Sequence, residues 1–219
     1  MKKSSAISDL LRVMARLRSP TGCPWDREQD HRSIRWHAVE EVYEMIDAIE
    51  AGDDQELEEE LGDLLLQVVF QCQLAQERKA FNFEKVARRI TDKLIRRHPH
   101  VFGDVKVKDV DQVWANWEKI KRAEKHGTKH ARASALDGIP KHLPSLLRAE
   151  KLVKKARKAK LLEPDARKSR VSKAALGETL FNLAKTAQQN GWSAEELLRR
   201  EIQKQERALR KAERRRSAA

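Results

Sequence analysis

The sequence predicts an all-α protein, and three observations support that prediction. Apolar residues recur every three or four positions along most of the chain, which is the spacing that places them on one face of a helix. No segment alternates apolar and polar residues with the period of two that is typical of a half-buried strand. Charged residues make up 37% of the chain and aromatic residues 5%, a composition that suits helices with solvated outer faces.

The first two helices end at residues that favour turns. An amphipathic helix with apolar positions over residues 10–17 is expected to end before Pro20, because proline disfavours the helical conformation in the residue before it. A second helix is predicted over residues 33–50, with Gly52 as its C-terminal stop.

Three further helices are predicted from their caps and apolar positions. Asp53 or Asp54 provides an N-terminal cap for a third helix that continues to about residue 78. Asn82 caps a fourth helix, which is expected to end at His98-Pro99. A fifth helix is predicted around residues 110–125.

The chain is expected to contain two related helical units. Gly62-Asp63-Leu64-Leu65 is echoed by Gly177-Glu178-Thr179-Leu180, and each is followed by an apolar helix and then by a basic one. This echo predicts a duplicated unit, with chance similarity between helical segments as the alternative. The predicted division is a first domain over residues 1–128, a linker over 129–145, and a shortened second unit over 146–219.

Composition excludes several classes of protein. The chain of 219 residues has no run of eighteen apolar residues that could cross a membrane, and no apolar block follows its basic start. Its two cysteines, Cys23 and Cys72, do not form a disulfide framework of the kind found in secreted proteins. A cytoplasmic protein is therefore expected. The net charge of +12 is concentrated in residues 151–216. The tail over residues 207–216 is expected to be a solvated helix rather than a nucleic-acid arm, so nucleic acid is not expected as a partner.

Acidic residues are concentrated in residues 40–63, which hold twelve of the 34 acids and no lysine or arginine. The pattern within this segment reads Glu40-Glu41-x-x-Glu44, then fifteen residues, then Glu60-x-x-Asp63. Residues three apart on a helix share a face, so each of the two helices presents a pair of carboxylates. The acids of residues 53–59 are expected to form a solvated helix face.

The acids of the third helix lie among apolar residues. Residues 61–72 are apolar almost all round, so this helix is expected to be buried. One narrow strip of it is nevertheless polar, formed by Glu60, Asp63, Gln67 and Gln71. A buried carboxylate costs several kcal/mol unless it is paired or binds a metal. We therefore expect the two helices to build a cage of four carboxylates between them.

Such a cage favours hard cations. Its ligands are all carboxylate oxygens, which suit Mg²⁺ or Mn²⁺ better than Zn²⁺. Residues 40–63 contain no histidine, so neither acid pair there forms the Glu-x-x-His motif of di-iron bundles. Because Mg²⁺ keeps waters and takes substrate phosphates as its remaining ligands, the cage predicts a phosphorylated substrate.

Several motifs, in this order, resemble those of the MazG nucleoside triphosphate pyrophosphohydrolases. They are Gly22-Cys23-Pro24-Trp25-Asp26, Glu40-Glu41-Val42-Tyr43-Glu44, Glu60-Leu61-Gly62-Asp63-Leu64-Leu65, residues 92–102 with His98-Pro99-His100, Trp117-Glu118-Lys119-Ile120-Lys121, and residues 134–140. The resemblance covers residues 7–155. It implies an all-α homodimer with a metal site in a four-helix core. It also implies Mg²⁺-dependent hydrolysis of nucleoside triphosphates to monophosphate and pyrophosphate, as house-cleaning of the nucleotide pool.

The resemblance also implies roles for individual residues. The catalytic set would be Glu40, Glu41, Glu44, Glu60 and Asp63, of which all but Glu40 would be metal ligands. The substrate contacts would be Lys93 and Arg97 to the triphosphate, Trp117 to the base or sugar, and Lys121 to a phosphate. Without the resemblance, Trp117 would be expected in the core, and the two cations of the fourth helix could equally form a solvated face.

The second unit departs from the two-domain pattern of the family. It keeps Glu178 where the family has the aspartate of Glu-x-x-Asp, but its other metal ligands are missing. Activity is therefore expected in the first unit, with a structural role for the second. Two alternatives remain, a basic nucleic-acid-binding protein and a catalytically inactive scaffold. The first leaves the acidic strip unexplained, and the complete set of acids argues against the second.

Overall fold

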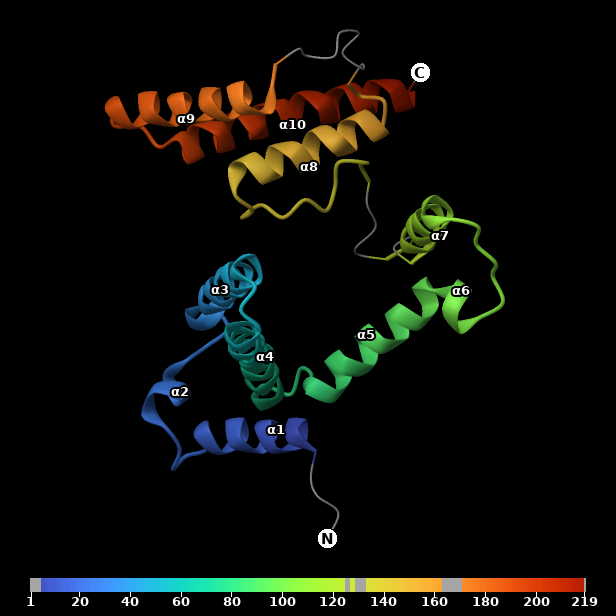
Figure 1. The fold of residues 1–219 in the computed structure, drawn as a ribbon. Coiled ribbons are helices and arrows are strands. Elements are labelled where there is room, and N and C mark those ends of the chain that lie inside the picture. The colour runs from blue at the N-terminus through green and yellow to red at the C-terminus, as the bar shows by residue number, and fades with distance from the viewer. Residues whose placement is uncertain (1–4, 125–126, 129–132, 163–170, 219) are drawn as a thin grey trace. The chain divides into compact units, whose positions relative to one another are not determined.

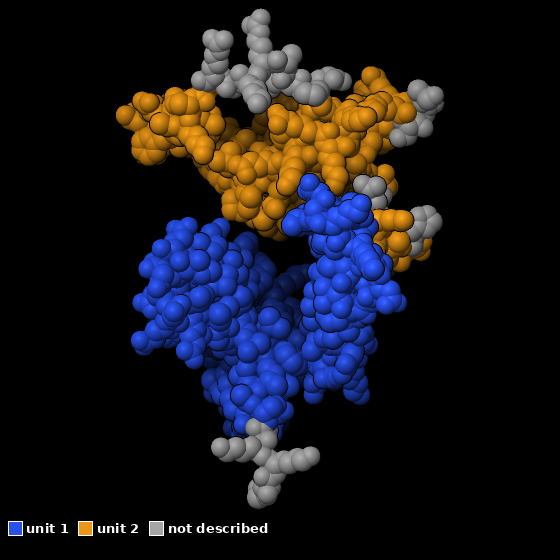
Figure 2. All heavy atoms as spheres, turned by 45° about the vertical axis from the view of Figure 1, so that its right-hand side comes forward, with its two compact units in different colours: residues 1–117 blue, residues 118–219 orange. Residues whose placement is uncertain are grey.

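The computed structural model describes residues 5–124, 127–128, 133–162 and 171–218 (Figure 1). Over these residues the secondary structure is helical, with no strand, which confirms the all-α prediction. The chain divides into two compact units, Met1–Trp117 and Glu118–Ala219 (Figure 2). No helix in the described part of the chain combines the length and apolar character needed to cross a bilayer.

The elements of unit 1 follow the expected order. They are α1 (Ala6–Leu17), α2 (Pro24–Glu28), the short 3-10 helix η1 (Ser33–Arg35), α3 (His37–Ala51), α4 (Asp54–Glu77), α5 (Phe83–Arg97), α6 (Pro99–Phe102) and α7 (Val110–Ala123), which continues into unit 2. Three of the expected caps are present. Gly52 ends α3 in the left-handed conformation at φ 70°, where glycine carries no steric penalty. The side chains of Asp53 and Asn82 accept backbone N–H groups at the starts of α4 and α5.

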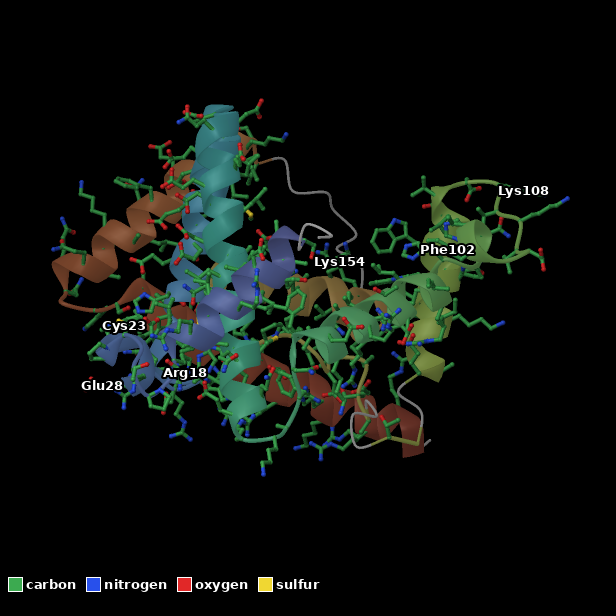
Figure 3. The ribbon with its side chains drawn as sticks, turned by 90° about the horizontal axis from the view of Figure 1, so that it is seen from below. Arg18, Cys23, Glu28, Phe102, Lys108 and Lys154 are labelled. Carbon is green, nitrogen blue, oxygen red and sulfur yellow. The ribbon has the colours of Figure 1, made fainter. Side chains whose placement is uncertain are left out.

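Helices α3 and α4 form a hairpin, and α1 packs against the C-terminal half of α4 (Figure 1). The core of unit 1 consists of Met14, Ile34, Val69, Phe70 and Leu74. At its edge, Arg18 at the end of α1 (Figure 3) makes two bonds of 2.7 Å to the carboxylate of Glu77 at the end of α4. This ion pair links the C-terminal ends of α1 and α4.

The expectation that α4 is buried all round is wrong for the single chain. Leu61, Leu65 and Val68 form a stripe along α4 that is 39–49% exposed. A second exposed apolar stripe on α3 is formed by Val39, Tyr43 and Ile46. We call these two sets the apolar stripes of α3 and α4. Apolarity in the sequence shows that a surface avoids water, but it does not distinguish coverage by the same chain from coverage by another.

Unit 2 contains α8 (Ser145–Lys158), α9 (Lys173–Gln189) and α10 (Ala194–Ala218). Helices α8 and α10 pack together around a core of Leu136, Leu152, Ala156 and Ile202. Buried Arg148 pairs with Glu206 at 2.7 Å, and Arg210 bridges Glu206 and Asp137. Of the linker expected at residues 129–145, residues 129–132 lie outside the described part, while Leu136 contributes to this core. The tandem duplication and the domain boundaries stay predictions.

Candidate metal centre

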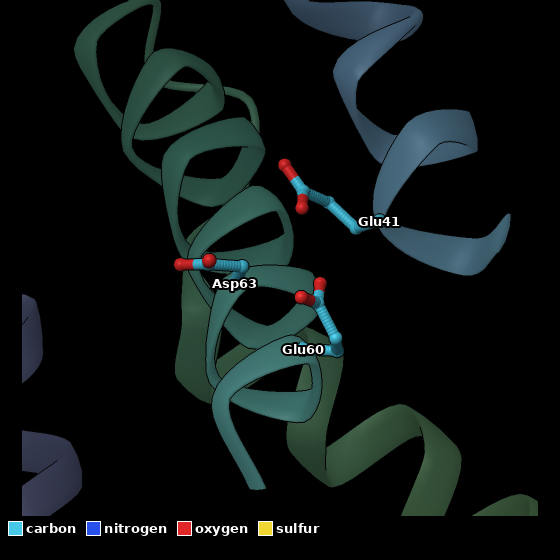
Figure 4. A group of neighbouring side chains, drawn as sticks. All are labelled: Glu41, Glu60 and Asp63. Carbon is cyan, nitrogen blue, oxygen red and sulfur yellow. The ribbon is translucent and has the colours of Figure 1, made fainter. Parts of the chain in front are cut away.

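Three acidic side chains meet between α3 and α4. Glu41 from α3 and Glu60 and Asp63 from α4 each place one carboxylate oxygen within 4.8 Å of the others (Figure 4). Glu41 lies eleven residues before Gly52, and Asp63 lies eleven after it. Because a helix rises about 1.5 Å per residue, the hairpin brings these positions to the same height. We call Glu41, Glu60 and Asp63 the carboxylate cluster.

The environment of Glu60 is unfavourable for an isolated carboxylate. Glu60 is only 8% exposed, and its Oε2 atom has no hydrogen-bond partner. Burial raises the pKa of Glu60, and the negative charges of Glu44, Glu56 and Asp63 raise it further. A divalent cation would supply both the missing partner of Oε2 and the missing positive charge. The donor set, consisting of carboxylate oxygens, fits a hard cation such as Mg²⁺ or Mn²⁺.

Glu44 and Glu40 lie beside the cluster. Loss of hydration raises the pKa of Glu44, and Glu41 and Glu40 raise it further by charge repulsion. Glu44 itself lies outside the cluster. Glu40 is exposed and lies 3.5 Å from Nδ1 of His37. Of the four acids predicted as a cage, three share the cluster and the fourth borders it.

The polar strip of α4 contains a contact that the sequence did not assign. The Nε2 atom of Gln67 donates a hydrogen bond of 3.1 Å to Oε1 of Glu41, and both side chains are half-buried. Gln71, one turn further on, instead accepts a hydrogen bond from Nδ1 of His31. The alignment of both glutamines with Glu60 and Asp63 was visible in the sequence, but their partners are on other elements.

The predicted substrate residues lie on α5 and α7. Arg97 is buried, and its guanidinium carbon lies 5.2 Å from the ring centroid of Trp117. The ring of Trp114 packs edge-on against Trp117 at 5.6 Å. Lys93 is half-buried one turn before Arg97 on α5. In unit 2, Lys121 pairs with Glu118 at 3.3 Å.

Comparison with known proteins gives consistent matches. Residues 29–102, which include the carboxylate cluster, match a family model described as the MazG nucleotide pyrophosphohydrolase domain. The chain is 41% identical to the nucleoside triphosphate pyrophosphohydrolase of Escherichia coli, over 95% of this chain and 87% of that protein. It is 43% identical to the nucleoside triphosphate pyrophosphohydrolase/pyrophosphatase MazG of Thermotoga maritima, over 71% of this chain and 59% of that protein. It is also 47% identical to the uncharacterized protein YabN of Bacillus subtilis, over 65% of this chain but only 28% of that protein.

Proposed function

The chain belongs to the MazG nucleotide pyrophosphohydrolase family, and we propose that it hydrolyses nucleoside triphosphates to nucleoside monophosphate and pyrophosphate in an Mg²⁺-dependent reaction. The observation that carries this proposal is the carboxylate cluster with the unpartnered oxygen of Glu60. The similarity to the Escherichia coli enzyme, which extends over 95% of the chain, supports it. House-cleaning of the nucleotide pool in the cytoplasm is the role we propose for this activity.

The cluster would hold the cation through Glu41, Glu60 and Asp63. A divalent cation bound there would polarise phosphate oxygens of the substrate and lower the pKa of an attacking water, with Mn²⁺ as a substitute for Mg²⁺. Glu44 lies one turn after Glu41 on α3, so it would complete the ligand set or accept the proton of the attacking water. Glu40 would contribute a further negative charge from outside the carboxylate cluster.

We propose that the basic and aromatic residues of α5 and α7 bind the rest of the substrate. Lys93 and Arg97 carry positive charge suited to a triphosphate. Arg97 already contacts the ring of Trp117, so the guanidinium also helps to orient that ring. Trp117 would then contact the base or sugar, and Lys121 a phosphate.

We propose that the active form is a homodimer. The apolar stripes lie on the two helices that carry the acids, and exposed apolar residues aligned along a helix are suited to contact with a partner. A second copy that covers them would complete a four-helix core and exclude water from the cluster. We assign a structural role to unit 2, because Glu178 is exposed there and the acidic group found among the described residues lies in unit 1.

Product analysis tests the proposed reaction directly. A panel of standard and modified nucleoside triphosphates is incubated with the protein and Mg²⁺, and the products are separated by ion-exchange chromatography. Equal amounts of monophosphate and pyrophosphate are expected. Release of orthophosphate and a nucleoside diphosphate would identify a phosphatase instead. The absence of turnover across the panel would favour an inactive scaffold.

A further inference from the structure

Gln67 lies on the polar strip of α4, one turn after Asp63, and the proposed reaction does not use it. We propose that Gln67 is a positioning residue, whose carboxamide holds the carboxylate of Glu41 in the orientation that binds the cation. This inference rests on the proposed metal-dependent function. It concerns how the cluster is arranged before the cation arrives.

The contact joins the two helices that form the cluster. The 3.1 Å bond from Nε2 of Gln67 reaches Oε1 of Glu41 across the α3–α4 interface, where both side chains are half-buried. A carboxylate that accepts a hydrogen bond on one oxygen keeps its other oxygen available as a metal ligand. The amide is uncharged, so it orients Glu41 without competing with the cation for negative charge.

Glu41 needs such an orienting contact because its acidic neighbours repel it. Glu44 lies on the same helix, and Glu60 faces it from α4, where Glu41 contributes to the raised pKa of Glu60. Without a hydrogen-bond donor, the flexible side chain of Glu41 would turn toward water, away from these charges. Hydrogen bonds to metal ligands of this kind commonly account for about 10- to 100-fold in metal affinity.

Gln71 provides a matched control on the same strip. Its Oε1 accepts from Nδ1 of His31, and Nε2 of His31 accepts a bond of 3.1 Å from Nε of Arg78. These bonds tie the segment before η1 to α4 and do not involve the cluster. Gln67→Met and Gln71→Met therefore remove the same functional group, at nearly constant volume, from successive turns of one helix.

The test measures Mn²⁺ binding to the metal-free protein by the electron paramagnetic resonance signal of free Mn²⁺. Gln67→Met is expected to weaken binding about 10-fold, whereas Gln71→Met leaves the dissociation constant within about twofold of the parent. Gln67→Leu, which also lacks the amide donor and adds no charge, is expected to weaken binding about as much. For Gln67→Met, the Mg²⁺ concentration that gives half-maximal turnover should rise by the same factor, with kcat at saturating Mg²⁺ close to that of the parent.

The controls separate this inference from the proposed function. If Gln67→Met binds Mn²⁺ like the parent while Glu60→Gln does not bind it, the cluster holds the metal and the role of Gln67 is wrong. If Gln67→Met and Gln71→Met weaken binding equally, the effect comes from the packing of α4, and the positioning role is again wrong. If Glu60→Gln and Asp63→Asn both bind Mn²⁺ like the parent, the cluster itself is not the metal site.

Discussion

Glu41 of α3 and Glu60 of α4 place carboxylate oxygens within 4.8 Å of each other across the helix interface, and the charge of Glu41 adds to the rise in the pKa of Glu60 that burial begins. Close acidic groups of this kind oppose folding unless a cation joins them. The α3–α4 hairpin therefore holds an arrangement that is unfavourable by itself and becomes favourable when a cation binds.

Removing one acid of the cluster should abolish turnover without unfolding the protein. Glu60→Gln and Asp63→Asn each remove a proposed ligand charge at constant volume, and pyrophosphate release should fall at least about 100-fold. The matched control is Glu59→Gln, an exposed acid on the same helix, which should keep full activity. Circular dichroism checks that the variants remain helical. Retained turnover in either variant would remove that residue from the site.

The stability of the metal-free protein should depend on pH through Glu60. Because its folded pKa lies above the unfolded value, the stability linked to this group is fully present below the ordinary glutamate pKa of about 4.3 and is lost as pH rises through the raised value. In excess chelator, the melting temperature of the parent should fall relative to that of Glu60→Gln as pH rises from about 4.5 to 7.5. Parallel pH profiles for the two proteins would contradict this expectation.

The pair between Arg18 and Glu77 should show the opposite pH dependence. The hydrogen bonds from Arg18 hold the pKa of Glu77 below its ordinary value, so the stability they provide is present above that value and lost as pH falls. Glu77→Gln should lower the free energy of unfolding by about 1 kcal/mol at pH 7, measured in urea, and by less near pH 3. Glu84→Gln, which removes an exposed pair with Arg88, should cost less than about 0.5 kcal/mol.

The apolar stripes should mediate self-association. Leu65→Arg places a charge on the stripe of α4, 39% exposed in the single chain, so it should disrupt a dimer without disturbing the core of unit 1. Sedimentation velocity should show a dimer for the parent and a monomer for the variant. Lys85→Glu, an exposed charge change on α5, serves as the control and should stay dimeric. A monomeric parent would refute the assembly proposed above.

Local signals in the sequence were sufficient for much of the fold. Gly52, Asp53 and Asn82 act on backbone groups within a few residues, so the helix ends they specify could be predicted. The spacing of the acids likewise placed Glu60 and Asp63 on one strip. Contacts between distant elements have no such local signature. The pair between Arg18 and Glu77, 59 residues apart, could not be predicted in this way.

Local sequence patterns also did not predict which side chains are exposed. The sequence indicated that Leu61 and Leu65 avoid water, but in the single chain they are exposed. Arg97 belongs to a basic helix end that predicts a solvated or substrate-binding surface, yet it is buried against Trp117. Burial depends on which elements pack together, and apolar periodicity constrains that choice without determining it.

The most direct measurement is a crystal structure of the protein soaked in Mn²⁺, with anomalous scattering used to locate the ion. A peak between α3 and α4, within about 2.5 Å of carboxylate oxygens from Glu41, Glu60 and Asp63, is the predicted result. A fully occupied Mn²⁺ site elsewhere in the protein, with the three carboxylates turned apart into solvent, would contradict the central claim.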